Sequence, residues 1–389
     1  MPVSVHLARN GPVGAAILAG ILWSVGAIDQ IAPQPDRLAL LLAGLVLLWI
    51  HLRGQGSAAM VGYYAFLIGA AERISRIPLT DGSDVVRATT EAIQTLLAGG
   101  NPYAHVMQST IPVGSPFVYP PGEFLFYLPS YLLVNDIYRV DTITGVLSIG
   151  LILLAGLRVG WDRVALPAML YATWGVGAFR AVDGSNDVSA AFMVIVGLVA
   201  LTFADPRTRA GRVAYVVSAV ALGWAMAFKQ FSVVIVPLVV RHLAVSGRDW
   251  RRYAAISVGT AAAFVLPFLL WDPGAFLSQQ VASLTFHDTL WGISILNFLG
   301  QYGDVTALYP VFFLGEVALT LLGFFFAVRA RLATVGMAAF AGCGVILIAL
   351  LLARWSTQPY YIYVGAIACT ALALVDRSAG APENLESAR

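Results

Sequence analysis

Apolar stretches long enough to cross a lipid bilayer fill most of this chain, and short polar loops separate them. A membrane-spanning helix needs about 20 mainly apolar residues, with a range of roughly 17 to 25. The candidate segments are 12–28, 38–52, 57–71, 121–134, 142–157, 164–179, 188–203, 213–228, 231–245, 253–271, 308–328, 335–353 and 360–375. The first is interpreted as a retained helix, although 25–27 could also be a signal-cleavage site. The sequence predicts an all-α polytopic membrane protein with about 12 transmembrane helices.

Charged residues are too scarce for a water-soluble protein of this length. Of the 389 residues, 59% are hydrophobic and 11% are charged, whereas an ordinary soluble domain carries about 25% charged residues. The 23 Lys and Arg nearly balance the 21 Asp and Glu, so the net charge of +2 gives no reason to expect nucleic acid. Cys343 and Cys369 lie inside apolar stretches and are interpreted as packing residues. Residues 1–389 are therefore expected to form a single integral domain within a lipid bilayer.

The distribution of Lys and Arg predicts which side of the membrane each loop faces, because cytoplasmic loops hold an excess of positive charge. The basic positions are Arg9, Arg53 and the loops 205–212, 246–252 and 328–331. If these lie inside, two long polar stretches, 72–120 and 272–307, lie outside. Residues 376–389 then form a polar cytoplasmic tail.

One apolar segment between the two outer stretches is expected not to cross. There are seven such segments, and seven crossings would place the second stretch inside. The weakest is 164–179, which Pro167, Gly175 and Gly177 interrupt. Irregular backbone is tolerated at membrane depth where it lines a cavity, so this segment is predicted to be re-entrant or surface-lying. If two segments elsewhere were wrongly merged, or one wrongly divided, the number of crossings between the two outer stretches would also become even.

The first outer stretch contains an amphipathic helix. Its apolar positions are Val85, Ala88, Ala92, Ile93, Leu96 and Leu97. Arg87, Glu91 and Gln94 fall on the opposite face, a spacing typical of a helix that lies on a membrane surface. Asp84 stands at its start, where a carboxylate can cap free backbone N–H groups. From spacing alone, Asp84 is equally a helix cap or a functional carboxylate.

The motifs of this chain resemble those of the GT-C type membrane glycosyltransferases, most closely the polyprenyl-phosphate-mannose-dependent mannosyltransferases of glycosyltransferase family 87. The matching segments are Asp84, Leu96-Leu-Ala-Gly-Gly-Asn-Pro-Tyr103, Tyr119-Pro-Pro121, Gly184-Ser-Asn-Asp187, Gly223-Trp-Ala-Met-Ala-Phe-Lys229 and Arg248-Asp-Trp-Arg-Arg252. The resemblance covers residues 57 to 375. It departs from the family pattern at Arg87 and Ala88, near which a tyrosine is usual.

The resemblance implies a GT-C-like bundle with amphipathic helices in its outer loops, and a transferase at the extracytoplasmic face of the cell membrane. Such an enzyme moves mannose, or another hexose or pentose, from a polyprenyl-phosphate donor to a lipid, glycan or protein acceptor. A carboxylate takes the proton of the acceptor hydroxyl, and cations or N–H groups stabilise the leaving phosphate. A single displacement inverts the anomeric configuration. Asp84 is the expected base, with Asp81 as the second candidate.

Candidate substrate-binding residues lie near the outer ends of the apolar segments. They are Asn101, Tyr103, Tyr119, Asp183, Asn186, Asp187, Lys229, Gln230, His287, Arg354, Gln358 and Tyr360. Lys229 and Arg354 are the cations expected to hold the donor phosphate, although Lys229 could instead snorkel to the interface. Asp187 could equally be an N-cap, and Glu123 is interpreted as an interfacial carboxylate.

Two other interpretations remain open, and so does metal dependence. A secondary transporter or lipid-linked sugar flippase would also carry a re-entrant segment and polar residues, and a non-catalytic assembly protein is the third class. No internal repeat is found, and charged residues gather near the outer ends of segments, which favours the transferase. Asp81, Asp84 and Asp187 could share a divalent cation, although their spacing does not compel it.

Overall fold

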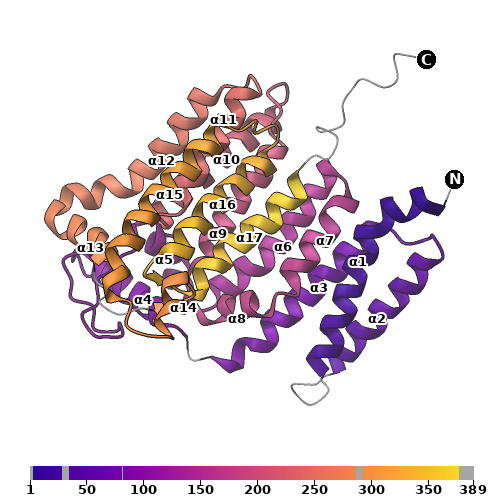
Figure 1. Ribbon diagram of the computed structural model, residues 1–389, viewed down its shortest axis with the longest axis horizontal. Coiled ribbons are helices and arrows are strands. Elements are labelled where there is room, and N and C mark those ends of the chain that lie inside the picture. The colour runs from indigo at the N-terminus through magenta and orange to yellow at the C-terminus, as the bar shows by residue number, and fades with distance from the viewer. Residues whose placement is uncertain (1–2, 29–34, 81, 286–290, 376–389) are drawn as a thin grey trace.

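The computed structural model describes residues 3–28, 35–80, 82–285 and 291–375, which form a bundle of helices (Figure 1). The elements are α1 (Val3–Ile28), α2 (Pro35–Leu52), α3 (Ala58–Arg76), η1 (Ile77–Leu79), α4 (Asp84–Leu97), α5 (Gly122–Val134), α6 (Val140–Val159), α7 (Trp161–Ala172), α8 (Gly175–Asp183), α9 (Asp187–Thr202), α10 (Arg209–Phe228), α11 (Ser232–Val245), α12 (Trp250–Trp271), α13 (Pro273–Thr285), β1 (Trp291–Gly292), α14 (Ile295–Gly300), η2 (Thr306–Leu308), α15 (Tyr309–Arg329), α16 (Val335–Leu352), β2 (Trp355–Ser356) and α17 (Gln358–Leu374). The short strands β1 and β2 pair in parallel. The predicted all-α class is confirmed.

Five helical stretches in the described ranges are long and apolar enough to cross a membrane. They are α6, α10, α12, the stretch Thr306–Arg329 that contains α15, and α16. The pair α8 and α9 passes the same test as one span but is bent by 109° at its break. Several further segments, such as α11 and α17, form apolar helices of 10–17 residues. The chain is therefore a multi-pass membrane protein.

Helix α9 lies in the middle of the bundle, and small residues let its neighbours approach. Ala190, Ala191 and Ile195 are fully buried. A Cβ at Gly197 would lie only 2.6 Å from the side chain of Leu222 of α10. The Leu222 side chain therefore packs directly against the backbone of α9 at this point. Close packing through small residues is the usual way in which membrane helices associate.

The segment 164–179 runs through the bundle beside α3. Gly62, near the start of α3, packs against Trp161 at the start of α7, and Gly69 packs against Ala172 at the end of α7. The two helices therefore run side by side in the same direction, from one end of the bundle to the other. The prediction that 164–179 stays on one side is contradicted. The helix does break after α7, and α8 lies across the end of the bundle (Figure 1).

Helix α5, within segment 121–134, begins and ends at the same end of the bundle. Glu123 in its first turn accepts a hydrogen bond from Thr89 of α4 at 2.6 Å. Tyr138, just beyond its last turn, packs against Gly82, which lies two residues before α4. Because both of its ends contact the region of α4, α5 is the apolar segment that does not pass through. A surface-lying segment therefore exists, but it is α5.

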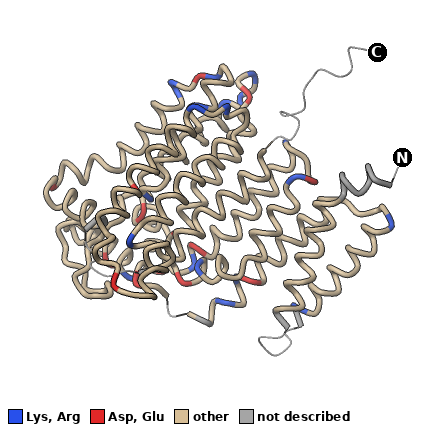
Figure 2. The backbone as a smooth tube through the Cα atoms, viewed as in Figure 1, with Lys and Arg blue, Asp and Glu red and all other residues tan. Residues whose placement is uncertain are grey.

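Because α7 passes through the bundle and α5 does not, the basic turns lie together at one end of the bundle. The guanidinium of Arg158, at the end of α6, lies over the ring of Phe203 at a distance of 5.0 Å. Phe203 ends α9 and precedes the basic loop 205–212. We call this end, with the turn 158–163 and the loops 205–212 and 246–252, the basic face (Figure 2). The opposite end, with α4, α5 and α8, is called the site face.

Candidate functional site

Helix α4 is fixed to the turn between α8 and α9 by backbone contacts. The Ser83 N–H donates to the carbonyl of Asp183 at 2.6 Å, and the Ser83 hydroxyl donates to the carbonyl of Gly184 at 2.9 Å. Gly184 has φ +72°, and a Cβ there would lie 2.8 Å from Val86. Glycine is needed at this position because it adopts positive φ readily and leaves room for α4. The amphipathic helix and the motif 184–187 therefore meet.

Asp84 is a free carboxylate at the start of α4. Ser83 is the N-cap, and its side chain accepts a hydrogen bond from the Val86 N–H at 3.3 Å. The interpretation of Asp84 as the cap is therefore wrong. Its side chain is partly exposed and makes no hydrogen bond or ion pair with any residue that the structure describes. A carboxylate in this state is available to a ligand.

Lys229 and Asp187 form a buried ion pair. Lys229 follows the last turn of α10 and is 3% exposed, and Asp187 begins α9 and is 1% exposed. The Lys229 ammonium also donates to the side-chain oxygen of Asn186 at 3.1 Å and lies 5.0 Å from the centre of the Tyr360 ring. A buried charge needs a partner of this kind. Lys229 therefore does not snorkel into water.

Glu123 is a second buried carboxylate of the site. From the sequence it was interpreted as an interfacial carboxylate and not as a site residue. Its side chain is fully buried. The Oε1 atom accepts from Thr89 at 2.6 Å and from the Asn186 amide at 3.2 Å, whereas Oε2 has no partner within the described residues. A carboxylate inside an apolar segment is costly and therefore a functional signal in itself. That signal, two residues after the Pro-Pro pair, was present in the sequence.

Asp141, in the first turn of α6, holds the turn before α9. Its carboxylate accepts from the Tyr127 hydroxyl at 2.9 Å and from the Asn186 N–H at 3.3 Å. It also accepts from the N–H of Ser189 at 3.3 Å and from the Ser189 hydroxyl. Asn186 has a positive φ of 61°, which these bonds help to hold. Sequence reasoning missed Asp141 because its partners lie 14 to 48 positions away.

Asp183 connects the same turn to α17. Arg180 donates to the Asp183 carboxylate at 2.5 Å and, through Nε and Nη2, to the Gln358 side-chain oxygen at 3.2 and 3.1 Å. Asp183 also accepts from the Ser185 N–H at 3.0 Å. Gln358 therefore lies beside the turn. Arg180 was missed.

Tyr119 lies among these charged groups, in the loop that precedes α5. Burial raises the pKa of Tyr119 well above its ordinary value, and the neighbouring Tyr360, Asp187, Glu123 and Asp84 raise the pKa further. The phenol is therefore neutral at physiological pH. Asp84 itself follows Ser83, whose backbone and hydroxyl groups hydrogen-bond Asp183 and Gly184 in the turn before Asp187.

Three other candidates support the loop that carries Tyr119. Tyr103 is 1% exposed, packs against Phe276 with ring centres 4.9 Å apart, and donates to the carbonyl of Tyr119 at 2.8 Å. Asn101 accepts from the Tyr103 N–H at 3.0 Å. Gln230 is exposed and donates to the carbonyl of Val118 at 2.8 Å. These contacts position the loop.

Arg354 stands at the junction of α16 and β2, and its guanidinium lies 5.4 Å from the centre of the Tyr309 ring. It forms no ion pair with any residue in the described ranges, and its side chain is partly exposed. His287 and Asp81 lie outside the described residues. Among the residues that are described, no group of three or more His, Cys, Asp or Glu side chains could hold a metal ion.

No protein-family profile matches this chain, and no curated protein matches it. Among solved structures, the chain is similar to the crystal structure of ArnT from Cupriavidus metallidurans in the apo state. The identity is 20% and the TM-score is 0.48, over 75% of this chain and 54% of the other. The chain thus spans about half the length of ArnT. A likeness at this level does not assign the chain to a family or an activity.

Proposed function

We propose that this chain is a membrane glycosyltransferase that takes a sugar from a polyprenyl-phosphate donor, and that the cluster at the site face is its active site. One observation carries this proposal. Asp84 is a partly exposed carboxylate without a partner among the described residues, and it follows Ser83, which hydrogen-bonds the α8–α9 turn that leads to the buried Asp187 and Lys229 pair. A lipid-linked sugar keeps its chain in the bilayer and presents its phosphate and sugar at such an end. The GT-C-like motifs, which carry these same residues, support the proposal.

In this mechanism Asp84 takes the proton from the acceptor hydroxyl as its oxygen attacks the anomeric carbon, which is general-base catalysis. The bond from the sugar to the phosphate breaks in the same displacement, so the configuration inverts. Positive charge must stabilise the departing phosphate. Arg354, which has no acidic partner among the described residues, is the principal cation, and Lys229 is the second. Because Asp187 already neutralises Lys229, this lysine contributes less charge than Arg354.

The finer proposal concerns sugar and acceptor. The resemblance to family 87 favours mannose or a related sugar, a lipid, glycan or protein acceptor, and an extracytoplasmic position of the site face in the cell membrane. The basic turns at the opposite face agree with that orientation, because positively charged loops stay in the cytoplasm.

A flippase or transporter is the second candidate, and the 109° break between α8 and α9 favours it. Broken helices form the substrate sites of many secondary transporters, near the middle of the membrane. Here the break contacts Ser83 and α4 at the site face. That position suits a group that reacts at the interface better than a site that alternates between two sides.

The test is sugar transfer from a polyprenyl-phosphate donor by purified protein in detergent. We expect Asp84→Asn to lower turnover by about 10²- to 10⁴-fold, the usual contribution of a general base. Because asparagine cannot accept the proton but preserves the shape, thermal stability stays close to that of the parent. Asp304→Asn, which alters an exposed carboxylate elsewhere, is the matched control and should retain activity.

Two outcomes would redirect the proposal. Loss of activity in Asp81→Asn, with near-parental activity in Asp84→Asn, moves the base to Asp81. Lipid or sugar transport in liposomes, with no transfer by the parent protein, replaces the transferase by the transporter.

A further inference from the structure

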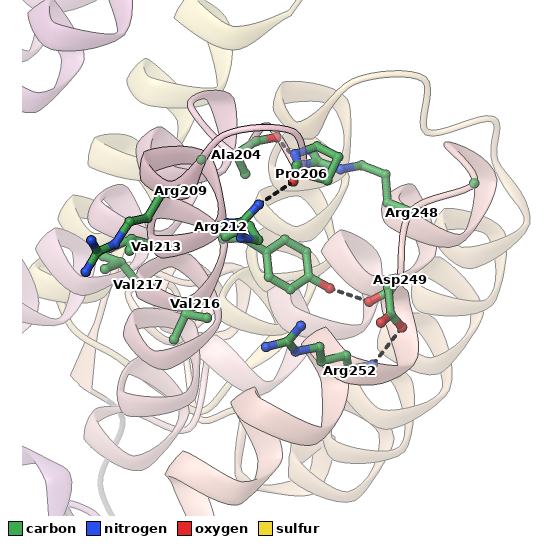
Figure 3. A pocket seen from close by; sticks show the side chains of 13 residues that line it. Ala204, Pro206, Arg209, Arg212, Val213, Val216, Val217, Arg248, Asp249 and Arg252 are labelled. Atoms are coloured by element: carbon green, nitrogen blue, oxygen red, sulfur yellow. Dashed lines mark hydrogen bonds between the residues drawn. The ribbon is translucent and has the colours of Figure 1, made fainter.

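A cavity of about 720 Å³ lies at the basic face, at the far end of α10 from Lys229. It is lined by the first turns of α10, by the loop before α10, and by the α11–α12 loop with the start of α12 (Figure 3). Four arginines line it: Arg209 and Arg212 from α10, Arg248 from the loop and Arg252 from α12. Because α10 has 20 residues and rises 1.5 Å per residue, the cavity is about 30 Å from the candidate active site and distinct from it.

The four arginines that line the cavity outnumber its acidic residues, since Asp249 is the one carboxylate among the lining residues. Its carboxylate, Asp249, is used to cap α12, since it accepts from the Arg252 N–H at 3.1 Å. Arg212 donates to the carbonyl of Pro206 at 3.1 Å, and Arg248 donates to the carbonyl of Ala204.

The four guanidinium groups form no ion pair with any acidic residue in the described part of the chain. The side chains of Arg209 and Arg252 make no hydrogen bond there either. A site with these donors is suited to an anion with several oxygen atoms, above all a phosphate group.

The same cavity continues onto an apolar, lipid-facing surface. Val213, Val216 and Val217 of α10 line it next to Arg209 and Arg212 (Figure 3). Val213 is 55% exposed and Val217 is 42% exposed, so in a membrane both contact acyl chains. A free anion would gain nothing from these valines, whereas a lipid would gain burial of its chain.

We infer that this cavity binds an anionic membrane phospholipid. Its phosphate is held by Arg212 and Arg252, and one of its acyl chains lies along Val213 and Val217. Basic pockets between membrane helices at this side of a bilayer are suited to acidic lipid head groups. The inference uses residues outside the candidate active site and does not depend on the proposed transferase activity.

The test is native mass spectrometry of the full-length protein with phosphatidylglycerol and, separately, with phosphatidylcholine. We expect phosphatidylglycerol to be retained preferentially, and the double variant Arg212→Gln/Arg252→Gln to bind it at least about tenfold more weakly, because the phosphate loses two charge-assisted donors. The matched control is Arg207→Gln/Arg251→Gln, which removes two exposed arginines from the same loops but outside the cavity. The control should bind as the parent does.

A gain-of-binding variant keeps the test independent of folding defects. Asp249→Asn can still cap α12 but removes the acidic group from the cavity, so phosphatidylglycerol should bind more tightly. Equal weakening in both double variants, or equal retention of both lipids, would overturn the proposal. Displacement of the lipid by glycerol 1-phosphate at equal concentration would show a site for free phosphate, and this too would overturn it.

Discussion

At the scale of single residues, the burial of Lys229 changes the experiment that its role requires. Lys229→Met leaves Asp187 charged and unpaired in the core, and breaking a buried pair in this way costs about 3–5 kcal/mol. The double variant Lys229→Met/Asp187→Asn should recover most of that stability, because neither charge remains. Thermal unfolding of the parent, the two single variants and the double variant measures the coupling.

Activity in the same set of variants separates structure from catalysis. If the pair takes part in binding the donor phosphate, the double variant should be stable and yet poorly active. A double variant with parental turnover would mean that Lys229 only neutralises Asp187.

Arg354 has no competing carboxylate among the described residues, so its substitution acts more directly on the donor. Arg354→Lys should be poorly tolerated, because lysine cannot hold a phosphate through two parallel hydrogen bonds. Donor affinity should fall more than acceptor affinity. The measurement is transfer rate against donor concentration at saturating acceptor, with Arg331→Lys, an exposed arginine, as the control. Unchanged donor dependence in Arg354→Ala would contradict the role.

At the scale of elements, α4 carries a carboxylate that organises the loop after it. Burial raises the pKa of Glu91, but hydrogen bonds from the Ser109 hydroxyl, the Gln108 and Ser109 N–H groups and His105 outweigh this effect and lower the pKa to about 2. A pKa below its ordinary value of 4.5 means that the ionised form stabilises the folded loop. This stabilisation is present above pH 4.5 and is lost as the pH falls toward 2.

Hydrogen exchange of residues 105–109 measures this effect. Protection should be constant near neutral pH and should decrease between pH 4.5 and pH 2. In Glu91→Gln, protection should be lower at neutral pH and should lack the acidic transition. A transition that persists in Glu91→Gln would assign it to another group.

At the scale of the whole molecule, the position of α5 decides which loops share a face. Arg139, beyond α5, and Asp162, in the first turn of α7, are both exposed. In a background without Cys343 and Cys369, Arg139→Cys should react with an impermeant thiol reagent added outside the cell. Asp162→Cys should react only after permeabilisation, as should Ser246→Cys in a basic loop. The reverse pattern for 139 and 162 would restore the crossing of α5 and remove that of α7.

The amino-acid sequence by itself determined the class of the fold. Long apolar stretches in a chain with few charges can satisfy their backbone hydrogen bonds in a bilayer only as helices or closed barrels, and segments of this length indicate helices. The amphipathic helix α4, and the existence of one apolar segment that does not cross, were also predictable, because apolar spacing and loop charge are local properties. Asp84, Asp187 and Lys229 belong to the motifs that resemble those of the GT-C enzymes, and the structure places each of them near the turn between α8 and α9 or the start of α4.

Only the tertiary structure decided which apolar segment stays on one side and which carboxylates form the cluster. Segments 121–134 and 164–179 are both apolar stretches that contain proline and glycine. Their contacts distinguish them, because Glu123 and Tyr138 both reach the region of α4, whereas α7 packs along α3. Asp141 likewise acquires its role from Tyr127 and Ser189 on other helices. Hydrogen bonds between residues far apart in the chain leave no periodic pattern in the sequence, so packing alone assigns them.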